Sequence, residues 1–200
     1  MNSQFNNLTA KRRSIYALGD NLSQSPEEIF DLIKVAVKNS PTAFNSQTVR
    51  AVVLFGNKSD KVWEIVENAL RKIAKDEESF SKTKAKIDSF KAGYGTILYF
   101  TDSTIVRQLE ENYPTYADNF ANWAEQGLGG AQQAVWTTLA EQGIGASLQH
   151  YNPLIDDAIH EAFGLPKEWQ LRAEMPFGSI EGLPTAKDSL DDDKMFKLIK

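Results

Sequence analysis

The segment "GTILYFTD", residues 95–102, is apolar and rich in β-branched and aromatic side chains. Such a short run, opened by a glycine, is typical of a buried strand. The segment "VRAVVLFG" (49–56) has the same character and ends in a glycine. Two further segments, "IGASLQ" (144–149) and "EWQLRAEMPFG" (168–178), are also predicted to be strands. A sheet of these four strands is therefore expected at the centre of the protein.

Helical patterns lie between the predicted strands. Ser25 is a suitable N-cap and Glu28 completes a capping box, which predicts a helix over 26–39. Apolar residues at helical spacing predict further helices after Asp60 and over 103–112, 116–142 and 153–163. A break or bend is expected within 116–142, at Gly127, Gly129 and Gly130. Strands separated by helices indicate a layered arrangement of helices on a sheet.

The chain shows no linker that would divide it, so residues 1–200 are predicted to form a single domain. The tail after Gly178 has no obvious local partner. Its end, "KMFKLIK" (194–200), carries apolar residues that a monomer would leave exposed to water. We therefore expect residues 179–200 to be an extended arm that packs on a second subunit.

Composition excludes several classes of protein. The formal net charge of -5 argues against a general nucleic-acid binder, because the phosphate backbone requires a basic face. The absence of cysteine excludes disulfides, thiolate metal sites and a cysteine nucleophile. No secretory signal and no run of about 20 apolar residues is present, so neither export nor a membrane span is expected. The sequence predicts a cytoplasmic protein.

A basic cluster, "KRRS" (11–14), stands out in this acidic chain. Arg12 and Arg13 carry forked donors and Ser14 a hydroxyl, and together they could hold one phosphate group. A phosphate monoester carries nearly two negative charges, so a further cation is expected, and Lys187 in the tail could supply it. The alternative is a solvated helix end.

The segment "SPTAFNSQ" (40–47) places two amides after an aromatic residue. Asn45 and Gln47 each offer a donor and an acceptor, which suits the polar edge of a flat heteroaromatic ring such as a flavin. Phe44 is a candidate to cover the face of such a ring, together with Trp123. The alternative is that Asn45 only caps the preceding helix or starts the next strand.

Taken together, "KRRS", "SPTAFNSQ" and "W…GIGASLQHYNPLID" (136–156) resemble the nitroreductase family. The resemblance runs from about residue 9 to residue 190 and is greater to the small branch of fatty-acid-repression-mutant proteins, which are FMN-dependent oxidoreductases. It implies an α+β fold with α/β/α layers, in which helices flank a mixed central sheet.

The resemblance also implies a set of cofactor-binding residues and no catalytic side chain. Arginines and serine of "KRRS" would grip the FMN phosphate with the lysine of the tail, and the two amides would address the ribityl and pyrimidine side. The segment "LQH" would lie along the flavin. The full set is Arg12, Arg13, Ser14, Asn45, Gln47, Leu148, Gln149, His150 and Lys187. Larger relatives carry a Lys-x-Arg pair near the tail, whereas Asp188 and Ser189 follow Lys187 here.

The family is a homodimer with two FMN sites shared between subunits, and its C-terminal segment wraps over the partner. By resemblance, this chain would pass a hydride from NADH or NADPH through FMN to a nitroaromatic, a quinone or a similar small acceptor in a ping-pong reaction. One alternative is a flavin- or lipid-responsive regulatory protein whose turnover is incidental. Another is a structural dimer without a cofactor.

Other patterns carry weaker predictions. "GLGG" (127–130) lacks the full dinucleotide-binding fingerprint and follows a helix, which argues against a Rossmann domain. A metal site is not expected from two histidines without cysteine, and a charged helix face is favoured over it for His150, Asp156, Asp157 and His160. The four tryptophans are interpreted as core or interface anchors: Trp63, Trp123, Trp136 and Trp169.

Overall fold

A five-stranded sheet forms the centre of the computed structural model, which describes residues 3–200. The strands are β1 (Leu18–Gly19), β2 (Val49–Phe55), β3 (Gly95–Asp102), β4 (Gly145–Ala146) and β5 (Trp169–Ile180). Their order is β1-β5-β3-β2, and β4 pairs with β5 beside β1. The ladders between these strands are all antiparallel, so the expectation of a mixed sheet was wrong. One isolated parallel bridge joins Ser14 to Ala146.

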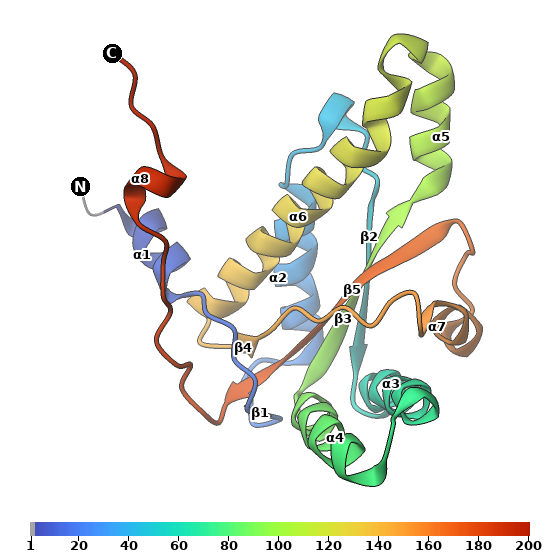
Figure 1. Cartoon of the computed structure of the whole chain (residues 1–200), viewed down its shortest axis with the longest axis vertical. Helices are drawn as coiled ribbons and strands as arrows, with labels where there is room; N and C mark the ends of the chain where they lie inside the picture. Colours follow the sequence, from blue (N-terminus) through green and yellow to red (C-terminus); the bar gives the residue numbers. More distant parts are fainter. Residues whose placement is uncertain (1–2) are drawn as a thin grey trace.

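Helices cover both faces of this sheet, as Figure 1 shows. The bounds of the long helices are α2 (Pro26–Lys38), α3 (Asn57–Ile73), α4 (Glu77–Lys91), α5 (Ser103–Asn112) and α6 (Ala117–Glu141). The shorter ones are α1 (Gln4–Lys11), η1 (Ala43–Asn45), η2 (Pro114–Tyr116), α7 (Asp156–Phe163) and α8 (Asp192–Met195). The α2 and α6 helices pack on one face, while α3, α4 and α7 pack on the other. The α+β class and the three layers confirm the prediction.

The alternation of side chains along β3 divides the interior into two cores. All eight residues of β3 are buried. Ile97 and Tyr99 point into the core beneath α2 and α6, whereas Leu98 and Phe100 point into the core beneath α3 and α7. Because it is apolar on both faces, this strand must be covered by helices on both sides.

The long helix α6 runs without interruption from Ala117 to Glu141. The expected break at the glycines was therefore wrong. Gly127 is buried, and a β-carbon there would lie 3.1 Å from Cγ2 of Thr42. At this position the glycine lets the 41–42 segment approach the helix closely, and tertiary packing outweighs its poor helix propensity.

Two predicted elements are shorter than expected. Of the strand expected over 144–149, only Gly145–Ala146 forms a ladder, and Gln149 adds an isolated bridge to Glu174. The helix expected from residue 153 begins at Asp156.

The C-terminal arm leaves the sheet after Ile180 and extends away from the body of the molecule (Figure 1). Its apolar side chains Leu190, Phe196, Leu198 and Ile199 are exposed. Packing of this arm on a second subunit stays a prediction. Within residues 3–200, no helix has both the length and the apolar character that crossing a bilayer requires.

Candidate functional site

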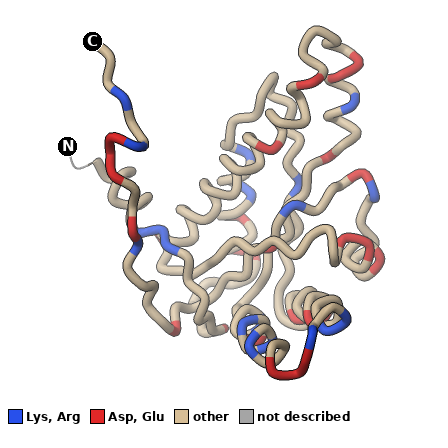
Figure 2. The backbone as a smooth tube through the Cα atoms, in the orientation of Figure 1, with Lys and Arg blue, Asp and Glu red and all other residues tan. Residues whose placement is uncertain are grey.

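A pocket of about 610 Å³ lies between the loop that follows α1 and the C-terminal tail. Arg12, Arg13, Ser14 and Lys187 all line it, so the structure brings together the four residues that the sequence assigned to a phosphate group. Asp188 is the acidic residue among its lining. Three cations and one carboxylate give the lining a formal charge of +2, from 3 minus 1. Figure 2 shows the basic 11–13 segment beside the tail.

Arg12 is fixed by its position at the end of α1. The helix ends at Lys11, and the backbone of Arg12 turns to an extended conformation while its N–H still donates to Leu8 O. Its guanidinium lies 4.3 Å from the centroid of the Trp136 ring. The Nε atom is buried and has no hydrogen-bond partner in the described part of the chain. Desolvation, and then the neighbouring charge of Arg13, lower the pKa of Arg12.

Arg13 connects the N-terminal loop to the tail. Its Nη2 atom donates a hydrogen bond of 2.6 Å to the backbone carbonyl of Thr185. This contact holds the segment that carries Lys187 against the loop that carries Arg12. The tail of the same chain therefore forms one wall of the pocket.

The segment 145–150 lies between β5 and the N-terminal loop. On one side, β4 pairs with β5, and Gln149 exchanges two backbone hydrogen bonds with Glu174, of 2.7 Å and 3.0 Å. On the other side, Ile15 N–H donates to Ala146 O at 2.9 Å. Gln149 is buried, Leu148 is half-buried and His150 is exposed. This segment is thus tied directly to the loop that carries the two arginines.

Glu174 supports the same segment from β5. Its side chain is buried, and its Oε2 accepts a hydrogen bond of 3.0 Å from Tyr151 N–H. Its Oε1 is buried, and no described residue forms a hydrogen bond with it. Desolvation raises the pKa of Glu174 to about 8, although the hydrogen bond from Tyr151 opposes this shift. Burial thus favours the protonated form of this carboxyl group.

The loop "SPTAFNSQ" has a strained backbone. Phe44, Asn45 and Gln47 all have positive φ, of 57°, 50° and 51°. The N–H of Gln47 donates to Thr42 Oγ1 at 3.0 Å, which holds the loop together. Because α2 ends at Lys38 with Asn39 as its cap, Asn45 does not cap that helix. Asn45 and Gln47 are both exposed.

An aromatic cluster surrounds Phe44. Its ring stacks on Trp123 with centroids 6.2 Å apart and an angle of 17° between the planes. The other rings of the cluster are those of Tyr113, Tyr116 and Phe120. Phe44 is 52% exposed, so this cluster presents an aromatic surface beside the two amides.

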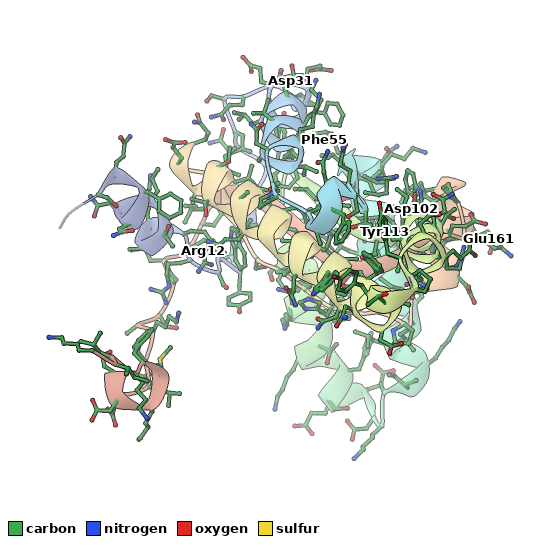
Figure 3. All side chains as sticks on the ribbon, turned by 90° about the horizontal axis from the view of Figure 1, so that it is seen from above. Arg12, Asp31, Phe55, Asp102, Tyr113 and Glu161 are labelled. Atoms are coloured by element: carbon green, nitrogen blue, oxygen red, sulfur yellow. The ribbon has the colours of Figure 1, made fainter. Side chains whose placement is uncertain are left out.

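Within a single chain, Asn45 and Gln47 do not lie beside the arginines that were also predicted to bind the cofactor. The loop packs on Trp123 near the start of α6, whereas Arg12 lies over Trp136 near its end. Thirteen residues of helix separate the two tryptophans, which corresponds to about 20 Å. Figure 3 shows Arg12 and Tyr113 at opposite ends of α6.

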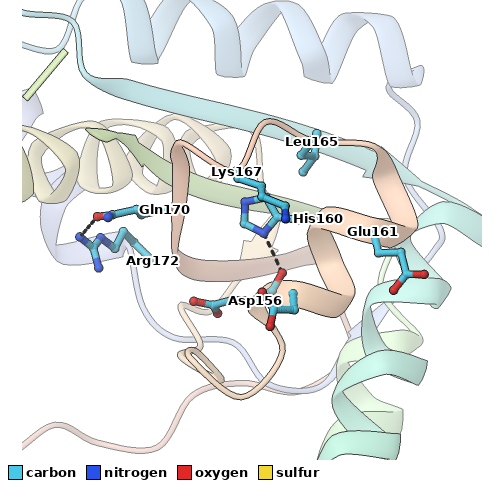
Figure 4. Close-up of a pocket in the computed structure, with 8 residues that line it drawn as sticks. Asp156, His160, Glu161, Leu165, Lys167, Gln170 and Arg172 are labelled. Carbon is cyan, nitrogen blue, oxygen red and sulfur yellow. Dashed lines mark hydrogen bonds between the residues drawn. The ribbon is translucent and has the colours of Figure 1, made fainter. Parts of the chain in front are cut away.

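A second polar pocket, of about 790 Å³, surrounds α7 and is drawn in Figure 4. His160 is held there by backbone carbonyls: Nδ1 lies 2.7 Å from Asp156 O, and Nε2 lies 2.7 Å from Trp169 O. Both ring nitrogens are thus engaged within the protein. Across residues 3–200, no three His, Cys, Asp or Glu side chains are grouped as a metal site requires.

Sequence reasoning did not assign Trp136 and Glu174 to the site. Trp136 was interpreted only as a core or interface anchor, and its position under Arg12 depends on how α6 meets the N-terminal loop. A glutamate in the middle of a predicted buried strand was a usable signal, because a charged side chain is rarely buried without a specific partner.

The three-layer fold, with a cationic pocket beside an edge strand, is that of the nitroreductase-fold oxidoreductases. The family model described as "Nitroreductase family" matches residues 9–179, so this chain belongs to the nitroreductase family. The predicted resemblance is confirmed.

Solved structures and a curated relative agree with this assignment. Nitroreductase CinD from Lactococcus lactis, in a complex with nicotinic acid, is 47% identical, with 98% of this chain and 100% of that chain covered and a TM-score of 0.91. A nitroreductase from Saccharomyces cerevisiae is 31% identical, with 88% and 94% covered and a TM-score of 0.76. A curated relative, nitroreductase FRM2 of Saccharomyces cerevisiae, is 31% identical over 189 residues, which is 93% of each chain.

Proposed function

We propose that this oxidoreductase binds FMN and uses NADH or NADPH to reduce a nitroaromatic, a quinone or a similar small acceptor in a ping-pong reaction. The observation that carries the proposal is the cationic pocket of Arg12, Arg13 and Lys187 at the end of the segment 145–150. The nitroreductase family generally uses FMN, which supports the choice of cofactor.

The lining of the pocket fits a phosphate monoester. Such a group carries close to two negative charges at neutral pH, and the lining has a formal charge of +2. The buried Nε of Arg12 has no hydrogen-bond partner among residues 3–200, and a phosphate oxygen would supply an acceptor for it. Ser14 adds a hydroxyl to the same wall. The donor set is therefore suited to the phosphate of FMN.

Leu148, Gln149 and His150 follow Ala146, which is hydrogen-bonded to the loop that carries the arginines, and we assign them to flank the flavin ring. The hydrogen bond from Ile15 to Ala146 fixes their segment relative to the arginines, so phosphate and ring contacts are held in one rigid arrangement. Bound FMN would supply the hydride-transfer chemistry between the nicotinamide and the acceptor. The residues of this chain would bind and orient the cofactor, and none is required as an acid or base.

A homodimer would complete the site. Because the loop of Asn45 and Gln47 packs at Trp123, about 20 Å along α6 from the Trp136 ring under Arg12, we assign these two amides to the FMN site of the opposite subunit. The exposed apolar arm after Ile180 would then have a partner surface to cover it. Each of the two sites would draw residues from both chains.

Nitroaromatic acceptors are supported by the relatives. CinD from Lactococcus lactis has been solved in complexes with chloramphenicol and with 4-nitrophenol, and it is 47% identical to this chain. The exposed aromatic surface around Phe44 is chemically suited to a flat aromatic acceptor.

The test is spectroscopic and kinetic. Purified protein is expected to be yellow, to release FMN on heating, and to oxidise NADH or NADPH in the presence of 4-nitrophenol or a quinone. Colourless protein that FMN cannot reconstitute would overturn the proposal. Bound FMN with no turnover on any acceptor would instead favour a regulatory binding protein.

A further inference from the structure

Trp136 joins three parts of the candidate site. It projects from α6, and its indole N–H donates a hydrogen bond of 3.1 Å to the carbonyl of Ala146 in β4. The same carbonyl accepts the N–H of Ile15, at 2.9 Å, from the N-terminal loop. The polar edge of the ring is thereby anchored to the strand beside the pocket.

The face of the anchored ring carries the guanidinium of Arg12, with 4.3 Å between Cζ and the ring centroid. Tryptophan is the side chain that attracts a cation over its face most strongly. Arginine has a long side chain with many rotamers, so a stacked position removes freedom that phosphate binding would otherwise have to remove. Arg12 also lines the pocket, so the stacked guanidinium is held at its wall.

We propose that Trp136 is a positioning residue, which holds the guanidinium of Arg12 ready for the phosphate group of FMN. The inference rests on the proposed function and adds a residue that acts through Arg12. Trp136 should therefore contribute to binding of the phosphate group of FMN and not to binding of the ring.

Riboflavin, which is FMN without its phosphate, separates this role from a general structural one. If Trp136 acts through Arg12, its loss weakens FMN binding and leaves riboflavin binding nearly unchanged. If Trp136 only supports the fold or the 145–150 segment, its loss weakens the binding of both flavins equally.

The experiment measures the Kd of FMN and of riboflavin for the full-length chain freed of flavin, by the change in flavin fluorescence. For Trp136→Leu we expect FMN to bind roughly 10-fold more weakly and riboflavin to change by less than about 2-fold. Equal weakening of both flavins, or no change in either, would overturn the inference.

A milder variant covers the case in which Trp136→Leu does not fold. Trp136→Phe keeps an aromatic face but loses the hydrogen bond to Ala146. It is expected to weaken FMN relative to riboflavin by roughly 3-fold, because phenylalanine attracts cations less strongly than tryptophan. In the Arg12→Ala background the same substitution should leave the ratio of the two Kd values unchanged, and an undiminished effect there contradicts a role through Arg12.

The chain offers a matched control in Trp169, whose ring lies 5.8 Å from the guanidinium of Arg50, away from the pocket. Trp169→Leu removes a tryptophan that contacts an arginine outside the pocket, and it should not change the ratio of the Kd of FMN to the Kd of riboflavin. A wild-type chain that binds neither flavin would refute the proposed function itself. A wild-type chain that binds FMN, with equal losses for both flavins in the Trp136 variants, would refute only this inference.

Discussion

Glu174 and Tyr151 are joined by a hydrogen bond in which Tyr151 N–H donates to Glu174 Oε2 at 3.0 Å. The carboxyl group is buried in the middle of β5, and its other oxygen has no hydrogen-bond partner within residues 3–200. Burial raises the pKa of Glu174 from its ordinary value of 4.5 to about 8. The fold therefore favours the protonated form of this side chain.

We predict that Glu174→Gln makes the protein more resistant to high pH. In the unfolded chain Glu174 loses its proton near pH 4.5, whereas in the folded chain it keeps the proton until about pH 8. The wild-type free energy of unfolding should thus fall, relative to the variant, as the pH rises between these values, by roughly 3–5 kcal/mol in total. Urea denaturation of both proteins at pH 5, 7 and 8.5 measures the difference. A difference that is constant with pH contradicts the prediction.

Gly178 is predicted to tolerate no side chain. A β-carbon there would lie 2.1 Å from Gly19 O and 2.8 Å from Tyr94 N, both of them backbone atoms that cannot move aside easily. We expect Gly178→Ala to lower the free energy of unfolding by more than about 2 kcal/mol, measured by urea denaturation.

Gly129 in α6 provides the control for Gly178. A β-carbon at this position would meet no atom within 4 Å, so Gly129→Ala should raise the free energy of unfolding by about 0.5–1 kcal/mol through helix propensity alone. If both variants lower the free energy of unfolding equally, the clash of the new β-carbon does not explain the effect at Gly178.

The long strands β2, β3 and β5 were predictable because their apolar patterns are strong, whereas the two-residue strand β1 was not predicted. The bounds expected for β3 and α5, 95–102 and 103–112, are those of the structure. The α4 helix was missed because the residues it buries, Phe80, Ile87 and Phe90, are sparse in a segment rich in lysine and serine. The α1 helix buries no residue, so it has no apolar stripe to detect.

The site was predictable only in part. The motifs predicted which segments would bind a phosphate group and which would contact a ring. The structure adds that Arg12 and Lys187, from opposite ends of the chain, line the same pocket. The position of the Trp136 ring under Arg12 could not be assigned, because it depends on tertiary neighbours that no local pattern encodes. The buried Glu174 did leave a signal, a charged residue inside a predicted strand, but its contact with Tyr151 N–H is also tertiary. Within one chain, the loop of Asn45 also packs near the start of α6, at the opposite end of the helix from Arg12.

Arg13 is predicted to have two separable roles. Arg13→Ala should weaken FMN binding by about 1.5–3 kcal/mol, which is typical of a lost charge-assisted hydrogen bond. It also removes the hydrogen bond to Thr185, so limited proteolysis within 181–190 should become faster. Lys11→Ala is the matched control, since Lys11 is a neighbouring exposed cation outside the pocket lining. If Lys11→Ala has the same effects, net charge alone explains them.

The proposed sharing of each site between subunits predicts complementation. One chain carries Arg12→Ala and Arg13→Ala, and a differently tagged chain carries Asn45→Ala and Gln47→Ala. Either variant alone should bind FMN weakly, since both of its sites lack one group of contacts. In the mixed dimer, one site would combine the intact arginines of one chain with the intact amides of the other, while the second site would lack both groups.

The purified mixed dimer is therefore expected to bind FMN with nearly wild-type affinity at about half of the wild-type stoichiometry. This outcome requires that Arg12 and Asn45 of different chains serve the same flavin. If both came from the same chain, every site in the mixed dimer would keep one defect and no tight site would appear. Fluorescence titration of the mixed dimer beside the two parent variants distinguishes the cases, because only a shared site yields an intact set of contacts from two defective chains.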